Sequence, residues 1–295
     1  MPASADIAPL TEARRGLIEI RNLGVVFPSV DAPVEAVTDV SLRVEPGEFV
    51  SLIGPSGCGK STLLNIVAGF VRPTTGTALL DGAPVKRPGS DRGVVFQQYS
   101  LFPWLTVRKN VEFGLRMQGV SASKRETSAR TLLGLAGLLA FENHYPDQLS
   151  GGMKQRVGIV RALATSPQML LMDEPFGALD AQTRVVMQEI LTNMWQKFRI
   201  SVLFITHDIE EAIFLSDRIY VMTARPGRIK AEIRVPLPRP RTAEMTFGAE
   251  FVGLVQNLKA LIREESLSAM GSELKDGGLS GFRMDVGPRG VENVV

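Results

Sequence analysis

One stretch of the sequence combines glycines, a lysine and hydroxyl side chains in a spacing that suits phosphate binding. The segment GPSGCGKST, residues 54–62, matches the pattern GxxxxGK[ST] between an apolar run and a helical pattern. The glycines would let backbone amides turn inward around phosphates, and the start of the following helix would add positive potential. Lys60 would reach the β- and γ-phosphates of a nucleotide, and the Ser61 hydroxyl would bind Mg²⁺. The predicted nucleotide-binding residues of this loop are Gly54, Pro55, Ser56, Gly57, Cys58, Gly59, Lys60, Ser61 and Thr62.

Two neighbouring carboxylates supply a second element of phosphate chemistry. The apolar run MLLMDE, residues 169–174, ends in Asp173 and Glu174, and open α/β sheets bind ligands at the carboxyl ends of their strands. Asp173 would coordinate Mg²⁺ directly or through water, and Glu174 would polarise the attacking water as general base. Taken alone, this pair is equally well explained as a strand that ends in solvated acids. The phosphate-binding loop upstream favours hydrolysis.

A second segment suited to binding phosphate lies far downstream of the first. LSGGMKQR, residues 149–156, sets a serine and two glycines at the start of a predicted helix. The Ser150 hydroxyl and the amides of Gly151 and Gly152 would form an anion site there.

Short β-branched runs alternate with helical patterns along the chain, which predicts an α/β domain with a largely parallel sheet. A helical stretch at about 106–140 interrupts the strands, with a capping box predicted at Ser123 and Glu126. Strands are predicted at 17–27, 38–44, 48–54, 77–82, 93–98, 168–174, 201–207 and 218–223, and further helices at 60–70, 181–198, directly after Asp208, and at 247–265.

Composition excludes several classes of protein. The 295 residues carry a net charge of only +2, without the basic stripe typical of a nucleic-acid binder. The single cysteine, Cys58, cannot form an internal disulfide, and the N-terminus lacks the layout of a signal peptide. The longest apolar stretch, at 132–141, is shorter than the about 20 residues that a membrane span requires. We therefore expect a cytosolic protein that reaches a membrane only through a partner.

From about residue 18 to 236 the sequence resembles the nucleotide-binding subunits of ABC transporters. LSGGMKQR is similar to the signature sequence of that family, and four smaller matches follow the family's order. Phe27 stands where an aromatic ring stacks on adenine, Gln97 in VFQQ matches the Q-loop glutamine, Asp180 in FGALD the D-loop, and His207 in ITHD the switch histidine. The signature residues implied by this resemblance are Leu149, Ser150, Gly151, Gly152 and Met153.

The resemblance implies an α/β fold of the P-loop NTPase type, the ABC ATPase cassette. Such a cassette has a mainly parallel sheet core, an antiparallel β subdomain and an inserted α-helical subdomain. We expect an N-terminal extension at 1–16, an ATP-binding domain at 17–240 with its helical subdomain at about 99–160, and a C-terminal helix with a disordered tail at 241–295.

The resemblance also implies how the two phosphate sites work together. Two copies would pair head to tail, so that the signature of one covers the γ-phosphate of ATP held by the P-loop of the other. Gln97 would contact the Mg²⁺ and the attacking water, His207 the γ-phosphate, and Asp180 would communicate across the dimer. Glu174, His207 and Gln97 are the implied catalytic residues, and Ser61, Gln97 and Asp173 the implied metal ligands. Further partners would be transmembrane permease subunits and, indirectly, an extracytoplasmic substrate-binding protein, which places the chain as a peripheral protein on the cytoplasmic face of the membrane.

A few positions depart from the family pattern or allow two interpretations. Met153 replaces the commonest glutamine of the signature, and Phe27 replaces a tyrosine, which keeps the stacking and loses a hydroxyl. Gln98 is an alternative to Gln97 as the Q-loop residue. Trp104 is either core filler or part of a groove for the membrane subunit. The arginines within 225–241 form a solvated face or favour an anionic membrane surface.

The leading function is the ATPase subunit of an importer. A soluble ABC-type ATPase and a module that binds ATP without hydrolysing it are alternatives, and Glu174 with His207 favours hydrolysis over the latter. The segments LFPWLTVRKNV and DEPFGALDAQTR are most similar to the nitrate, sulfonate and taurine importers, with importers of thiamine precursors or aromatic acids as the alternative.

Overall fold

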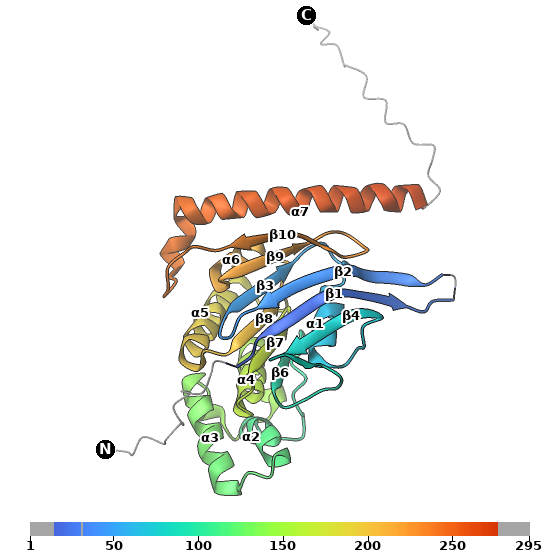
Figure 1. Ribbon diagram of the computed structural model, residues 1–295. Helices are drawn as coiled ribbons and strands as arrows, with labels where there is room; N and C mark the ends of the chain where they lie inside the picture. The colour runs from blue at the N-terminus through green and yellow to red at the C-terminus, as the bar shows by residue number, and fades with distance from the viewer. Residues whose placement is uncertain (1–14, 31, 277–295) are drawn as a thin grey trace, which may run out of the picture.

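The computed structural model describes residues 15–30 and 32–276, which form two β-sheets flanked by helices (Figure 1). One sheet has the strand order β10-β9-β3-β8-β7-β6, in which β10 alone is antiparallel to its neighbour, and the other is an antiparallel sheet of order β2-β1-β4-β5. This arrangement confirms the predicted fold class. The strands are β1 (Ile18–Phe27), β2 (Val34–Val44), β3 (Phe49–Ile53), β4 (Thr75–Leu80), β5 (Ala83–Pro84), β6 (Arg92–Val95), β7 (Met169–Asp173), β8 (Ser201–Ile205), β9 (Arg218–Met222) and β10 (Ile229–Arg234).

The central strand β3 shows how the core is built. Every residue of this strand is buried, because helices or the second sheet cover both faces, as in other parallel sheets. Phe49 and Ile53 pack in one hydrophobic cluster, and Val50 and Leu52 pack in the other. Because β3, β8 and β7 are neighbouring parallel strands, their carboxyl ends lie side by side above this packed core.

Three helices, α2 (Val107–Met117), α3 (Ala122–Leu135) and α4 (Gly151–Ala164), lie in sequence between β6 and β7. The predicted capping box at Ser123 is wrong, because α3 begins one residue earlier and Ser123 lies inside it. Ser121 occupies the N-cap with extended backbone angles and without a side-chain cap bond. The carboxylate of Glu126 instead approaches Arg108 at 3.3 Å and Arg130 at 3.9 Å.

The remaining helices pack against the parallel sheet. They are α1 (Lys60–Ala68), α5 (Ala181–Phe198), α6 (Ile209–Leu215) and α7 (Ala249–Asp276), with short 3-10 turns at Leu139–Phe141, Pro146–Gln148 and Ala243–Phe247. Helix α1 is shorter than predicted because Gly69 ends it in a left-handed conformation, with φ of 84°. Helix α7 is longer than predicted and continues to Asp276, so regular structure extends past Glu265. The predicted tail from residue 277 and most of the predicted N-terminal extension lie outside the described residues, and the domain boundaries stay a prediction.

Two arginines of the PLPRPR segment are not the solvated or membrane-facing side chains that we expected. Arg241 is 6% exposed, and its guanidinium donates to the carbonyls of Ile213, Phe214 and Ser216 at 2.7–2.9 Å. Arg239 donates to the Leu215 carbonyl and lies over the ring of Trp195. Both cations satisfy carbonyls at the end of α6, where the helix dipole favours positive charge.

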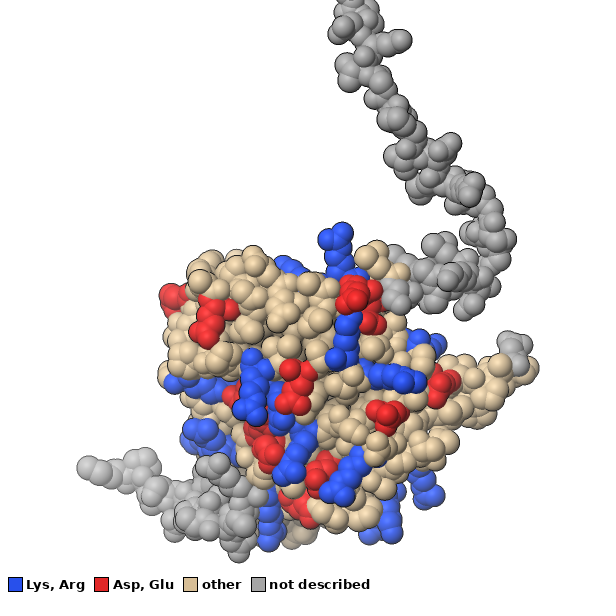
Figure 2. Space-filling model, turned by 45° about the horizontal axis from the view of Figure 1, so that its top comes forward, with Lys and Arg blue, Asp and Glu red and all other residues tan. Residues whose placement is uncertain are grey.

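The face that carries α7 and β10 has charges of both signs (Figure 2). Lys and Arg side chains lie among Asp and Glu side chains in this view. The ion pairs formed by residues of β10 include Arg218–Glu232 and Lys230–Glu264. Within residues 15–30 and 32–276, none of the helices combines the length and the hydropathy that crossing a bilayer requires.

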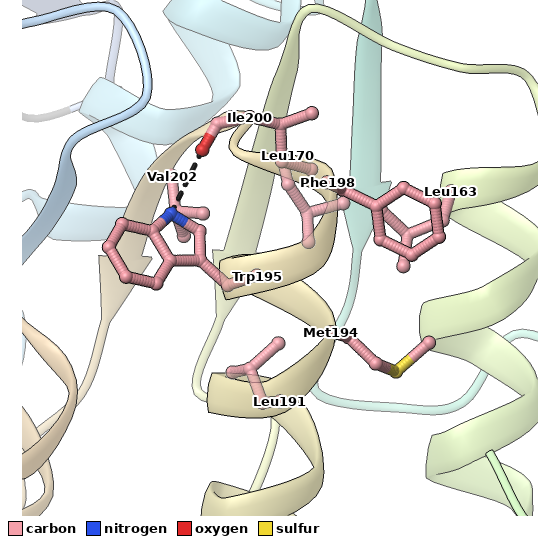
Figure 3. Close-up of a pocket in the computed structure, with 8 residues that line it drawn as sticks. All are labelled: Leu163, Leu170, Leu191, Met194, Trp195, Phe198, Ile200 and Val202. Atoms are coloured by element: carbon pink, nitrogen blue, oxygen red, sulfur yellow. Dashed lines mark hydrogen bonds between the residues drawn. The ribbon is translucent and has the colours of Figure 1, made fainter. Parts of the chain in front are cut away.

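A small cavity lies inside the core between α4, α5, β7 and β8 (Figure 3). Its volume is about 10 Å³, and its lining is apolar apart from the indole N–H of Trp195, which donates to the Ile200 carbonyl at 3.0 Å. A cavity of this size holds about one water molecule at most. It belongs to the packing of the core and is no ligand site.

Candidate functional site

The predicted phosphate-binding loop connects β3 to α1, as the sequence indicates. Gly59 is the N-cap of α1 with φ of 99°, a left-handed conformation that favours glycine. A Cβ on Gly59 would also lie 2.4 Å from a methyl carbon of Val37 in β2. The loop therefore requires glycine here for two reasons, backbone conformation and close packing.

Lys60 turns back into this loop. Its side chain is 7% exposed, and its ammonium group donates to the carbonyls of Gly54 at 2.9 Å and Pro55 at 2.8 Å. Cys58 beside it is buried, and burial raises the pKa of its thiol. The positive charge of Lys60 is thus held within the loop by two of the loop's own carbonyls.

Ser61 and Asp173 meet although 112 residues separate them in the chain. The hydroxyl of Ser61 donates to Oδ1 of Asp173 at 3.1 Å. Burial raises the pKa of Asp173 above its ordinary value, and the charge of Glu174 adds to the rise against the opposing effects of Ser61 and Lys60. A partly desolvated carboxylate beside a hydroxyl is the kind of oxygen pair that binds Mg²⁺ together with phosphates and water. The residues present fit the predicted metal, although the described part of the chain offers no group of three His, Cys, Asp or Glu ligands.

Glu174 and His207 lie at the ends of the neighbouring strands β7 and β8. The Nδ1 atom of His207 lies 3.1 Å from Oε2 of Glu174. Glu174 has φ of 43°, which is uncommon for a residue other than glycine, and its amide donates to the Ile205 carbonyl at 2.9 Å. The adjoining strand thus holds Glu174 in a strained conformation of the kind that is concentrated at functional sites.

Gln97 follows β6 on the other side of Glu174. A Cβ placed on Gly177 would lie 3.7 Å from Nε2 of Gln97 and 3.8 Å from Oε2 of Glu174. Both side chains therefore border the same glycine, which favours Gln97 over Gln98 as the Q-loop residue. Phe27 ends β1, pairs with Val34 and is 39% exposed.

The signature segment opens α4 in the manner expected from its sequence. Ser150 is the N-cap, and its hydroxyl accepts from the Met153 amide at 3.4 Å. Leu149 is buried, and the two glycines are tightly enclosed: a Cβ on Gly151 would lie 2.8 Å from the Tyr99 hydroxyl, and one on Gly152 would lie 2.6 Å from Thr183. Glycine is needed at both positions because a larger side chain would collide with these neighbours.

Asp180 has a local role besides its predicted one. It is the N-cap of α5 and accepts from the amide of Thr183 at 2.9 Å and from the hydroxyl of Thr183 at 2.7 Å. These hydrogen bonds lower the pKa of Asp180. The D-loop segment thus ends in a capped helix.

Comparison with known proteins decides the family. A family model described as ABC transporter matches residues 37–177. An uncharacterised ABC transporter ATP-binding protein of Methanocaldococcus jannaschii is 48% identical over 253 residues, which cover 86% of this chain and 94% of the relative. The chain belongs to the ABC transporter family. It is an ATP-hydrolysing cassette of that family.

Other relatives of this ABC cassette have names that specify a cargo. The nitrate import ATP-binding protein of Synechocystis sp. is 49% identical over 252 residues, covering 83% of this chain and 95% of the relative. The taurine import ATP-binding protein of Burkholderia pseudomallei is 52% identical over 211 residues, covering 72% and 81%. A solved dimeric cassette in a post-hydrolysis state bound to ADP and Pi is similar with a TM-score of 0.66 and 34% identity, covering 75% of this chain and 100% of that one.

Sequence reasoning missed one residue of the cassette that connects two of the predicted segments. Arg184 in α5 donates to Asp208 at 3.0 Å and to the Leu179 carbonyl at 3.2 Å. Asp208 follows His207, and Leu179 precedes Asp180, so this guanidinium joins the switch segment to the D-loop. The only signal was its spacing, because Arg184 lies four residues after Asp180 and thus on the same face of a helix.

A buried carboxyl group beside Arg184 was also missed. Glu211 in α6 is 4% exposed and accepts from the Gln188 amide at 3.3 Å. Burial is the main cause that raises the pKa of Glu211 to about 7. No feature of the sequence EEAIF distinguishes it from the exposed Glu210 except the amphipathic spacing of a short helix.

Proposed function

We propose that this ABC cassette is the ATP-hydrolysing subunit of an importer for a small anion such as nitrate, a sulfonate or taurine. The observation that carries the proposal is the identity of about half the residues to nitrate and taurine import ATP-binding proteins over most of both chains. The cassette would act as a peripheral subunit on the cytoplasmic face of the cell membrane. Its ATPase cycle would drive two transmembrane permease subunits, which receive the cargo from an extracytoplasmic binding protein.

In this proposal the phosphates of ATP replace the loop's own carbonyls as partners of Lys60. The ammonium group is already directed into the loop by its bonds to Gly54 and Pro55. The amides at residues 57–62 would bind the phosphates, since they border the start of α1. Phe27 would stack on the adenine ring.

Glu174 would act as general base on the attacking water. Its contact with His207 supports this role, and so does the position of Gln97, whose amide borders the same glycine, Gly177, as the Glu174 carboxylate. His207 would fix the orientation of Glu174 and contact the γ-phosphate, and Gln97 would orient the water.

Ser61 and Asp173 would hold Mg²⁺, with Gln97 as a further ligand. The 3.1 Å contact between the hydroxyl and the carboxylate supports this assignment. When bound, Mg²⁺ would neutralise charge that develops on the phosphate oxygens.

Two copies of the chain would complete each site. The segment around Ser150 has Tyr99, Leu179 and Thr183 as neighbours, and its exposed helix N-terminus would bind the γ-phosphate held by a second copy. The similarity to a dimeric cassette supports this arrangement. Hydrolysis would then remove the γ-phosphate that both copies contact, and the interface between them would weaken.

Growth of the source strain tests the cargo and the ATPase role together. A Lys60→Ala substitution removes a phosphate contact, and we expect loss of growth with nitrate as sole nitrogen source or with taurine as sole sulfur source, but normal growth on ammonium and sulfate. Lys259→Ala, which changes an exposed lysine of α7, is the matched control. Normal growth of the Lys60→Ala strain on both nitrate and taurine would contradict the proposed cargo class.

A further inference from the structure

The connection between β9 and β10, residues 223–228, lies between α7 and the phosphate-binding loop. Figure 1 shows α7 running along β10 toward this connection. On the α7 side, Oε2 of Glu265 accepts from the Ala224 amide at 3.0 Å, and Oε1 accepts from the Lys230 ammonium at 2.7 Å. The Glu265 side chain is 13% exposed, so this contact is partly buried. The C-terminal helix therefore holds the backbone of the connection directly.

On its other side the same connection contacts the phosphate-binding loop. The Arg225 guanidinium donates through Nε and Nη2 to the Gly57 carbonyl, both at 3.2 Å. Two residues further on, a Cβ placed on Gly227 would lie 2.0 Å from the Cys58 carbonyl oxygen, so the two backbones touch. The Gly227 amide also donates to the Ala36 carbonyl at 3.0 Å, which ties the connection to β2.

The bond from Arg225 fixes a peptide group whose orientation matters for phosphate binding. A trans peptide carries its carbonyl and its N–H on opposite edges. Because Arg225 holds the Gly57 carbonyl outward, the Cys58 N–H points into the loop, where it now donates to the Pro55 carbonyl at 3.4 Å. Gly57 has φ of 74°, and because glycine lacks a Cβ that would restrict the backbone, this peptide could turn without such an anchor. An inward amide is what a phosphate needs as donor.

We propose that α7 holds the phosphate-binding loop in its binding conformation, with Glu265 and Arg225 as positioning residues that act through the β9–β10 connection. The path runs from the Glu265 carboxylate to the Ala224 amide, and from the adjacent Arg225 to the Gly57 carbonyl. Neither side chain contacts the reacting atoms. The inference rests on the proposed function, in which this loop binds the phosphates of ATP.

The charge state of Glu265 suits this role. Burial acts to raise its pKa, but the hydrogen bonds from Lys230 and the Ala224 amide outweigh that effect and hold the pKa below its ordinary value. The carboxylate is therefore ionised at neutral pH. Glu264, one residue earlier, provides a natural comparison, because its side chain is 72% exposed and its bond to Lys230 lies at the surface.

Titration of the full-length chain with a fluorescent ADP analogue tests the proposal. Glu265→Ala and Arg225→Ala should each raise the Kd by about threefold to tenfold, and the double variant should bind no more weakly than the worse single one. The Kd of Glu264→Ala should stay within about twofold of that of the unchanged protein. The Kd of Arg225→Lys, which keeps one donor to Gly57, should lie between those of the unchanged protein and Arg225→Ala. The kcat at saturating MgATP should change less than the KM, because Glu174 and His207 are not displaced.

The outcomes separate the two proposals. Equal affinity of Glu265→Ala and Glu264→Ala, or additive effects of Glu265→Ala and Arg225→Ala, would overturn the role of α7. Arg225 is exposed, so its variants report on the loop even if Glu265→Ala lowers the stability of the fold. A failure of the unchanged protein to bind the analogue would overturn the proposed function and this inference with it.

Discussion

The Nδ1 atom of His207 lies 3.1 Å from Oε2 of Glu174, and the two residues follow the adjacent parallel strands β7 and β8, Glu174 by one residue and His207 by two. Asp173, the last residue of β7, pairs with Ile205, the last residue of β8, so each side chain projects from the same edge of the sheet. The contact is therefore set by strand register. A shift of the β7–β8 register by one residue would move the ends of the two strands relative to each other by about 3.3 Å and separate the two side chains.

Replacement of the proposed base should separate binding from turnover. We expect Glu174→Gln to lower the ATPase rate by about 10²- to 10⁴-fold, since an amide cannot accept a proton from water. The shape of the site is kept, so MgATP should still bind and hold two copies together. Size-exclusion chromatography in MgATP measures the dimer, and a variant that remained monomeric would contradict a site shared between two chains.

The hydrogen bonds from Arg184 to Asp208 and to the Leu179 carbonyl should affect kcat more than they affect stability. Its ion pair with Asp208 is partly exposed, and such pairs contribute about 0–1 kcal/mol. Arg184→Ala frees the switch and D-loop segments from each other, and we expect kcat to fall by about tenfold, within the roughly 10²-fold that a 1 Å misplacement can cost. Arg184→Lys keeps the charge without the second hydrogen bond, so its kcat should lie between those of the unchanged protein and Arg184→Ala. A kcat unchanged in Arg184→Ala would show that the segments are positioned independently.

Glu211 should make the cassette less stable as the pH rises from about 4.5 to about 7. Its pKa of about 7 in the folded protein exceeds the ordinary value of 4.5, so over this interval the folded state binds more protons than the unfolded state. The associated loss is at most about 3 kcal/mol and is complete above the folded pKa. Glu211→Gln should remove this part of the pH dependence and be more stable than the unchanged protein at pH 8. Urea unfolding at pH 5.5 and pH 8 measures it, with Glu210→Gln as control at an exposed neighbour.

Arg241 should be important for stability and not for catalysis. Its guanidinium serves three carbonyls at the end of α6, and removal leaves these acceptors buried without a charged donor. Arg241→Ala should lower the free energy of unfolding by about 3 kcal/mol, while Arg234→Ala at an exposed position should change it by less than about 0.5 kcal/mol. An equally small effect of both substitutions in urea unfolding would mean that water replaces the guanidinium.

The parts of the site that the sequence predicts are those that depend on local structure. Lys60 opens the helix that follows one buried strand, and Asp173 and Glu174 stand at the end of another strand. Open α/β sheets bind ligands at the carboxyl ends of their strands, so these residues are expected to lie together without knowledge of the packing. The parallel order of β7 and β8 likewise places His207 beside Glu174. The sequence also predicts the start of a helix at Ser150, but it does not predict the N-cap bond of the Ser150 hydroxyl with the Met153 amide.

The features that the sequence does not reveal depend on contacts between distant segments. Arg225 and Arg241 belong to one basic run, and yet one contacts Gly57 and the other the end of α6. Composition alone cannot distinguish these arginines from solvated ones. The capping box at Ser123 failed for a related reason, since the pattern fits but α3 begins before it, and the carboxylate of Glu126 is used by Arg108.

Because Glu174 has a left-handed backbone conformation, the residues that would make the fold more stable at this position are ones that cannot act as the base for ATP hydrolysis. Glycine and asparagine adopt φ near 43° at lower cost than glutamate, by about 1 kcal/mol for glycine. Substitution of Glu174 by glycine or asparagine would thus make the fold more stable and at the same time remove the base. A population of cassettes selected for thermal resistance alone should drift toward chains that hold ATP without consuming it, and glutamate at residue 174 would persist only where transport is selected.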